Sequence, residues 1–216
     1  MSATPSGAGA PVRRARFIVF EGPEGAGKTT QIERLRAELP EAVFTREPGG
    51  TPGGEAVRDA LLKREAAWSP LAEALLLAAA RDAHVREVIE PALKAQKTVI
   101  CDRYADSTEA YQGAGGGLDS EIVEQLRRWV CTREPDITLV FDIPVERGLA
   151  RAAARDSFDR FEAKGGAYHG RVRHRFRKIA EGPDAVLIDA DADEEIVAGR
   201  VRRALSTRFP NLFGAA

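Results

Sequence analysis

Short apolar runs alternate with longer amphipathic segments along this chain. Five runs are rich in β-branched or aromatic residues, and most of them lack polar alternation: 16–21, 42–45, 98–101, 137–142 and 185–189. Uninterrupted apolar strands are typical of parallel sheets that are covered on both faces. The pattern therefore predicts five parallel strands.

Helical patterns fill the intervals between these strands. An Ala/Leu-rich stretch predicts a long helix over 70–94, bent at Pro91. Asp119 is a candidate N-cap for another helix, and a last helix is expected over 193–206. Strands that alternate with helices indicate an α/β fold with a doubly wound sheet.

Composition supports one globular domain. The chain has 216 residues, of which 44% are hydrophobic and 30% charged, and its net charge of −1 indicates neither a nucleic-acid nor a membrane binder. No apolar stretch has the length of a membrane span. We expect a disordered tail over 1–15, one domain over 16–208 and a C-terminal tail over 209–216. Residues 1–15 lack the apolar middle of a secretory signal, so a cytoplasmic location is expected by default.

The segment FEGPEGAGKTT contains a phosphate-binding pattern, Gly22-x-x-x-x-Gly27-Lys28-Thr29. It follows the first predicted strand and precedes a helical segment, which is the context that this loop requires. Backbone N–H groups and the helix N-terminus hold phosphate oxygens, Lys28 reaches the β- and γ-phosphates, and Thr29 reaches Mg²⁺. The candidate contacts with ATP are Gly22, Pro23, Glu24, Gly25, Ala26, Gly27, Lys28, Thr29 and Thr30.

Three classes of nucleoside triphosphate-binding protein fit this loop: a phosphotransferase, a switch or motor, and a nucleic-acid-handling ATPase. A guanine-binding switch needs an N/T-K-x-D motif, which the chain lacks, and motors are usually longer. The small size and the many arginines outside the loop favour a kinase of small molecules.

Three further segments, FTREPGGTPGGE, DRYADSTEAYQG and ARDSFDRFE, resemble those of thymidylate (dTMP) kinases, over about 16–203. The resemblance implies a P-loop fold, a five-stranded parallel sheet flanked by helices, with a mobile lid over about 151–167. It also implies phosphorylation of dTMP by ATP with Mg²⁺, and a homodimer. Two alternatives stay open: a kinase of another nucleoside monophosphate such as dUMP or dGMP, and a nucleotide-binding regulator without activity.

The resemblance implies a set of dTMP contacts. Arg46 and Pro48 would shape the monophosphate site, and Glu24 would meet the 3′-hydroxyl of the sugar. The remaining expected contacts are Arg81, Ser107 and Thr108 at the thymine, Tyr111 at the sugar, and Gln112 as a further polar contact. Leu77 stands where the family pattern has a phenylalanine that stacks on the base, so it offers no aromatic face.

The DRY segment follows the third predicted strand, at the sheet edge where ligands bind in open α/β sheets. Asp102 can hold Mg²⁺ through water, and Arg103 can bridge the donor and acceptor phosphates. The alternative is an ion pair between them with a structural role only.

The transferring phosphoryl group needs positive charge around it. Some dTMP kinases carry an arginine in the phosphate loop where this chain has Ala26. The expected substitutes lie in the lid: Arg155 first, then Arg160, then Arg151, with Asp159 and Glu162 orienting the lid or touching Mg²⁺ through water. The alternative is a solvated basic face.

The segment HGRVRHRFRK could suggest a nucleic-acid contact. At helical spacing, however, Val172, Phe176 and Ile179 share one face while the arginines spread around the other. We therefore expect a helix beside the lid and no nucleic-acid partner.

Overall fold

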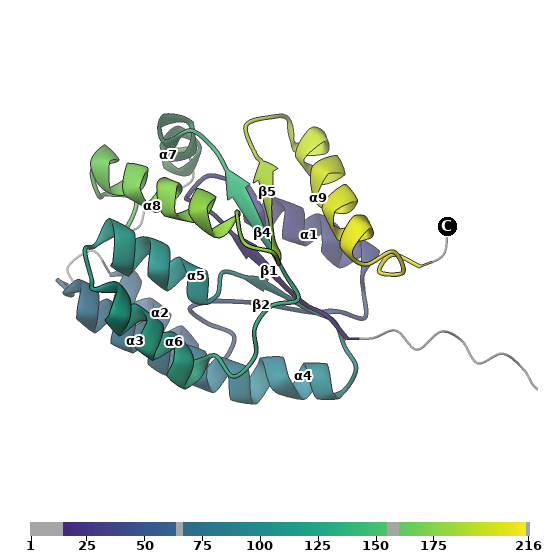
Figure 1. Ribbon diagram of the computed structural model, residues 1–216, viewed down its shortest axis with the longest axis horizontal. Helices are drawn as coiled ribbons and strands as arrows, with labels where there is room; N and C mark the ends of the chain where they lie inside the picture. Colours follow the sequence, from purple (N-terminus) through teal and green to yellow (C-terminus); the bar gives the residue numbers. More distant parts are fainter. Residues whose placement is uncertain (1–14, 64–66, 155–159, 215–216) are drawn as a thin grey trace, which may run out of the picture.

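In a computed structural model, the chain is described over residues 15–63, 67–154 and 160–214. Five strands form a fully parallel sheet in the order β2-β3-β1-β4-β5. Their bounds are β1 Phe17–Glu21, β2 Val43–Arg46, β3 Val99–Asp102, β4 Ile137–Asp142 and β5 Ala185–Asp189. Helices lie on both sides of the sheet (Figure 1). The predicted α/β fold and all five strands are confirmed, with two of them shifted by one residue toward the C-terminus.

Helices connect the strands, as the alternating pattern of the sequence predicts. They are α1 Lys28–Glu38, α2 Pro52–Leu62, α3 Pro70–His84, α4 Glu90–Lys94, α5 Ala105–Thr108, α6 Ser120–Val130, α7 Val145–Ala153, α8 Gly166–Ile179 and α9 Glu194–Arg208. Two π-helical turns, η1 Val85–Ile89 and η2 Glu109–Gly115, continue α3 and α5. Thr51, Ser69 and Asp119 cap α2, α3 and α6 with their side chains, so the predicted Asp119 cap is confirmed.

Both faces of the sheet are buried. Ile18 and Phe20 of β1 join a cluster with α1 and α9, whereas Phe17 and Val19 face η1 and the residues after β3. Successive side chains of a strand point to opposite faces, so a central strand needs apolar residues at every position. This explains why the strands read as continuous apolar runs.

The long helix expected over 70–94 is three consecutive helical pieces. The N–H of Glu90 donates to the carbonyl of Val85 in the π-turn that precedes Pro91. Proline has no N–H and its ring crowds the preceding turn, which accounts for the wider turn at this position.

The C-terminal segment packs further than expected. Phe209 and Leu212 are buried in the cluster that α1 and α9 share. The segment predicted to be a tail from residue 209 therefore covers the core as far as Leu212. No helix among the described residues is long and apolar enough to cross a membrane.

Candidate nucleotide site and acceptor site

The phosphate loop joins β1 to α1. Gly27 lies in the left-handed region (φ 82°) immediately before α1, which its missing side chain allows. Lys28 Nζ donates to the carbonyls of Gly22 (2.8 Å) and Pro23 (3.0 Å). Burial, and then the neighbouring Arg103, lower the pKa of Lys28 to about 8. The ammonium therefore lies over the loop, within the region where phosphates bind.

The tip of the loop packs directly on α7. A Cβ on Gly25 would lie 2.0 Å from the carbonyl oxygen of Gly148, and Gly25 itself has φ +67°. A Cβ on Gly148 would in turn lie 2.7 Å from the carbonyl oxygen of Glu24. Both glycines are needed because two backbones are in contact here. Gly148 was not singled out from the sequence, because Gly25, the residue that it contacts, lies 123 positions earlier in the chain.

Thr29 and Asp102 meet between α1 and the end of β3. Thr29 Oγ1 donates to Asp102 Oδ2 at 3.1 Å, while the buried Asp102 Oδ1 has no hydrogen-bond partner among the described residues. A hydroxyl and a carboxylate are oxygen ligands of the kind that Mg²⁺ takes beside phosphates. The two residues therefore fit the role of an Mg²⁺ holder.

Arg103 occupies a left-handed backbone position (φ 69°), which is uncommon for a residue with a side chain. Its Nη1 donates to the Gly22 carbonyl (3.0 Å) and to Ser107 Oγ (3.2 Å), and its Nη2 lies 3.5 Å from Glu24 Oε1. Burial alone would lower the pKa of Arg103, but the carboxylates of Glu24, Asp102 and Glu21 outweigh it and raise the pKa. The guanidinium is therefore a fixed positive charge beside the phosphate loop.

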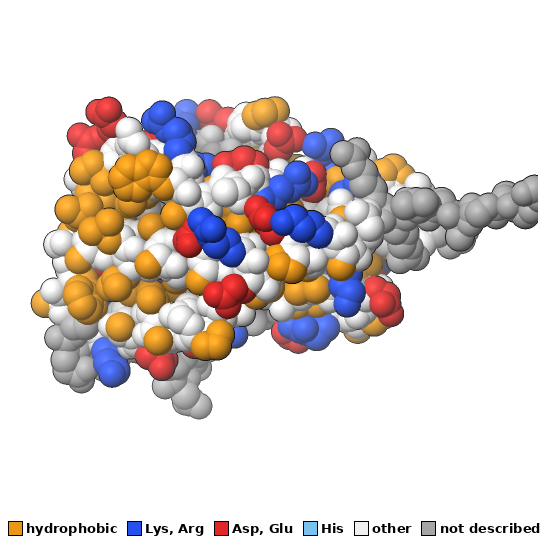
Figure 2. All heavy atoms as spheres, turned by 90° about the horizontal axis from the view of Figure 1, so that it is seen from below, with side chains coloured by type: hydrophobic (Ala, Val, Ile, Leu, Met, Phe, Trp, Pro, Cys, Tyr) orange, Lys and Arg blue, Asp and Glu red, His pale blue; other side chains and the backbone are white. Residues whose placement is uncertain are grey.

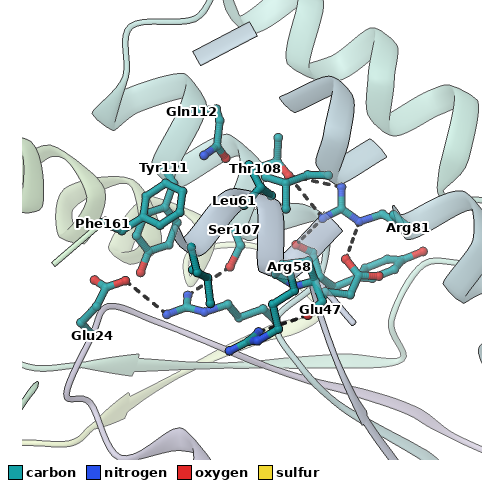
Figure 3. Close-up of a pocket in the computed structure, with 15 residues that line it drawn as sticks. Glu24, Glu47, Arg58, Leu61, Arg81, Ser107, Thr108, Tyr111, Gln112 and Phe161 are labelled. Atoms are coloured by element: carbon teal, nitrogen blue, oxygen red, sulfur yellow. Dashed lines mark hydrogen bonds and ion pairs between the residues drawn. The ribbon is translucent and has the colours of Figure 1, made fainter. Parts of the chain in front are cut away.

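Two cavities open beside this guanidinium. The larger, of about 670 Å³, is lined by the phosphate loop, Asp102, Arg151 and the segment that leads into α9. The smaller, of about 110 Å³, lies between α2, α3, η2 and Phe161. Four residues line both cavities: Glu24, Glu47, Arg58 and Arg103. Figure 3 shows the smaller one, with the Arg81 end opposite the end that carries Glu24 and Tyr111. A group bound in one cavity can therefore reach a group bound in the other at Arg103.

Comparison with known proteins agrees with this arrangement. The sequence profile described as thymidylate kinase matches residues 20–201. The chain is 48% identical to proteins described as thymidylate kinase from Bradyrhizobium diazoefficiens, covering 91% of both chains, and from Pseudomonas fluorescens, covering 91% of this chain and 95% of the relative. The solved thymidylate kinase from Ehrlichia chaffeensis superimposes with a TM-score of 0.74 at 34% identity, covering 88% of this chain and 98% of that one.

The chain belongs to the thymidylate kinase family. The smaller cavity, the candidate acceptor cavity, contains most of the residues expected to contact dTMP, and the larger one is the candidate nucleotide cavity. The acceptor cavity is lined by Glu24, Pro48, Leu77, Arg81, Arg103, Ser107, Thr108, Tyr111 and Gln112. Arg46, expected beside Pro48, lines the larger cavity instead, where its Nη2 lies 2.8 Å from Glu55 Oε2.

The Arg81 end of the acceptor cavity is rich in hydrogen-bond donors. Arg81 is 4% exposed and donates through Nε to Glu47 Oε2 (2.7 Å) and through both Nη atoms to Thr108 Oγ1 (3.2 Å). Ser107, by contrast, donates to Glu21 Oε2 (2.6 Å) and accepts from Arg103. Thr108 is thus placed beside Arg81, while Ser107 holds Arg103 in position.

The opposite end contains Glu24 and Tyr111. Glu24 Oε2 is buried without a hydrogen bond in the described structure and lies 3.7 Å from Nδ1 of the buried His169 on α8. Burial and then the Glu24 carboxylate raise the pKa of Tyr111 well above its usual range, with Arg103 acting in the opposite sense. Its hydroxyl therefore stays protonated and available as a donor beside a carboxylate acceptor.

The three candidate arginines differ in position. Arg155, expected to be the main one, lies outside the described residues, as does Asp159. Arg151 lines the nucleotide cavity and donates to the carbonyl of Ala190 (3.1 Å). Arg160 lies on the acceptor side: its Nη1 is 2.8 Å from Oε1 of the buried Glu73, and its Nε donates to the carbonyl of Leu61 (3.1 Å). Glu162 lines the nucleotide cavity.

Sequence reasoning missed several residues of this site. Arg58 of α2 lines both cavities and donates to the Pro48 carbonyl (3.1 Å), and burial and then Arg46 lower its pKa. Glu73 accepts from Gln112 Nε2 (2.8 Å) as well as from Arg160. A usable signal was present for Glu73, a charged residue whose neighbours at helical spacing, Leu76, Leu77 and Ala80, are apolar.

Proposed function

We propose that this protein transfers the γ-phosphoryl group of ATP to dTMP, forming ADP and dTDP. The observation that carries the proposal is the junction of the two cavities at Arg103, Glu24 and Arg58. A phosphotransferase needs a triphosphate site and an acceptor site that open onto each other. Membership of the thymidylate kinase family supplies the identity of the acceptor.

ATP would bind in the larger cavity, with its phosphates on the N–H groups of residues 22–30. Thr29 and Asp102 would hold Mg²⁺, which neutralises phosphate charge when bound. Lys28 would leave the carbonyls of Gly22 and Pro23 and donate to the phosphates. Arg151 donates to the carbonyl of Ala190 at the side of this cavity that leads into α9, where the base of ATP would extend, and Glu162 lines the same cavity.

dTMP would place its base at Arg81, Thr108 and Leu77, and its sugar at Tyr111 and Glu24. Arg81 carries only donors and fits a carbonyl oxygen of thymine. The Glu24 carboxylate would accept from the 3′-hydroxyl, a charge-assisted hydrogen bond. Because Glu24 belongs to the phosphate loop, one loop would then contact both substrates and fix their relative position.

The chemical step requires positioning and charge neutralisation more than acid–base catalysis. The oxygen of a monophosphate is already ionised at neutral pH, so it can attack the γ-phosphorus without a strong general base. Arg103 and Arg58 lie where the two phosphate groups would meet and would stabilise the charge that develops there. Arg155 remains the first candidate for the additional arginine.

Measurement of ADP release across a panel of monophosphates tests the proposal. We expect release with dTMP to exceed that with dUMP and dGMP, and Lys28→Ala to abolish it while circular dichroism stays unchanged. Preference for dUMP or dGMP would identify a kinase of another nucleotide. Nucleotide binding without monophosphate-dependent ADP release would identify a regulator instead.

The same assay ranks the arginines. Arg155→Ala is expected to lower kcat more than ATP affinity. Arg160→Ala should raise KM for dTMP, because Arg160 pairs with Glu73, and Glu73 accepts a hydrogen bond from Gln112 in the wall of the acceptor cavity. A large fall in kcat alone for Arg160→Ala or Arg151→Ala would contradict this assignment.

We also propose a homodimer through the face formed by α3 and α6. The hydrophobic side chains on this face are exposed: Leu71 (42%) and Leu75 (50%) on α3, and Ile122 (38%) and Trp129 (67%) on α6. Figure 2 views the molecule from the side on which α3 and α6 lie and shows hydrophobic side chains gathered there. A second copy would bury them. Light scattering should give a dimer mass for the unmodified protein and a monomer mass for Leu75→Glu; an unchanged mass in Leu75→Glu would argue against this face.

A further inference from the structure

A buried polar chain lies behind the Arg81 end of the acceptor cavity. His84, the last residue of α3, has no exposed surface. Its Nε2 lies 2.7 Å from Thr45 Oγ1 of β2, and its Nδ1 lies 2.9 Å from Glu47 Oε1. Glu47 Oε2 in turn accepts from Arg81 Nε at 2.7 Å. The order Thr45, His84, Glu47, Arg81 thus runs from the sheet edge to the cavity.

The direction of one hydrogen bond in this chain follows from chemistry. An ionised carboxylate only accepts, so the proton between His84 and Glu47 must be carried by His84 Nδ1. Both oxygens of Glu47 are then engaged, one by His84 and one by Arg81. A carboxylate held at both oxygens cannot rotate, and the arginine that shares it is held in one orientation.

The glycine loop leaves room for this arrangement. Gly50 has φ +78°, and a Cβ there would lie 2.6 Å from Thr45 Oγ1 and 2.8 Å from His84 Cδ2. A side chain at position 50 would therefore displace the Thr45–His84 hydrogen bond. The loop after β2 and the helix α3 are joined through His84 at this point.

We propose that His84 is a positioning residue for recognition of the base. Its Nδ1–H holds Glu47, and Glu47, together with Thr108 Oγ1 and the Tyr104 carbonyl, fixes the guanidinium of Arg81 in the wall of the acceptor cavity. His84 itself does not line the cavity, whereas Glu47 and Arg81 do. The inference rests on the proposed function because it takes dTMP as the acceptor. Arg81 would donate a hydrogen bond to a carbonyl oxygen of thymine, and it would disfavour dCMP, whose base has an amino group in place of one carbonyl.

Two substitutions of His84 test the roles of its two ring nitrogens separately. The amide nitrogen of His84→Asn can occupy the place of Nδ1, whereas that of His84→Gln can occupy the place of Nε2. If the bond to Glu47 is the important one, His84→Asn should keep the dTMP affinity within about twofold, and His84→Gln should lose about tenfold or more, the range for a hydrogen bond to a charged group. Discrimination against dCMP should fall in His84→Gln, while ATP affinity stays unchanged in both variants.

Calorimetric titration of dTMP into the whole protein measures this without turnover, and ADP release reports the proposed function separately. If the unmodified protein releases no ADP with dTMP, the proposed kinase function is wrong, but the dTMP affinities of the variants can still be compared. Glu47→Gln serves as the second variant and should lose dTMP affinity as His84→Gln does. Normal dTMP affinity in both would overturn the inference, as would equal losses for dTMP and ATP, which indicate a role in folding alone.

Discussion

Protonation of Glu21, the last residue of β1, should make the free energy of unfolding depend on pH. Its Oε1 accepts from the N–H groups of Tyr104 (2.8 Å) and Ser107 (3.1 Å). Burial first, and then Asp106, raise the pKa of Glu21 from 4.5 to about 7, although Arg103 and the hydrogen bonds act in the opposite sense.

The magnitude follows from proton linkage. Between pH 4.5 and pH 7 the folded protein holds a proton on Glu21 that the unfolded chain has released, so the free energy of unfolding falls as pH rises through this window. A difference of about 2.5 pKa units corresponds to about 3 kcal/mol of stability, which is fully present below pH 4.5 and fully lost above pH 7. Glu21→Gln keeps the carbonyl acceptor and removes the titration.

The assay is urea unfolding of the unmodified protein and Glu21→Gln at several pH values from 4.5 to 8. The free energy of unfolding of Glu21→Gln minus that of the unmodified protein should become more positive by about 3 kcal/mol over this range. Ser107→Ala removes a hydrogen bond that lowers the pKa of Glu21, so it should move the window to higher pH. A difference that does not vary with pH would refute the reasoning.

Three further predictions concern the phosphate loop. Since the pKa of Lys28 is lowered to about 8, its charge is lost as pH rises past that value. The ATP affinity of the free protein, measured by calorimetry, should therefore fall by up to about tenfold per pH unit above 8. A constant affinity up to pH 9.5 would contradict this prediction. Gly25→Ala should abolish ATP binding because its Cβ meets Gly148. Gly53→Ala, with nothing within 4 Å of the added Cβ, is the control and should bind ATP normally. Equal ATP affinities of the two variants would refute the close contact. Glu24→Gln should raise KM for dTMP about tenfold while leaving KM for ATP unchanged, and a 3′-deoxy analogue should be much less sensitive to the substitution; equal sensitivity would exclude the 3′-hydroxyl contact.

Local patterns were sufficient for the strands, the Asp119 cap and the phosphate loop. The loop motif at 22–29 and the DRY segment at 102–104 can be recognised because the residues of each lie within a few positions of one another. The π-turn before Pro91 was partly predictable, since proline indicated the irregularity but not its form.

Contacts between distant residues were not predictable in the same way. Arg81 was expected to need a partner, but Glu47, 34 positions away, could not be chosen among the many acids of the chain. Arg160 likewise carries charge that suits a phosphate, yet it pairs with Glu73. The choice depends on which backbone segments the sheet order brings together.

The sequence by itself determined the parallel sheet, the phosphate loop and the family of this protein, because apolar runs and short motifs act through neighbours in the chain. Only the tertiary structure decided that two cavities meet at Arg58 and Arg103, that Ser107 holds Arg103, and that His84 holds Glu47. The physical reason is that hydrogen bonds and ion pairs extend over only about 3 to 4 Å. Folding must therefore bring two groups within that distance before their chemistry is defined.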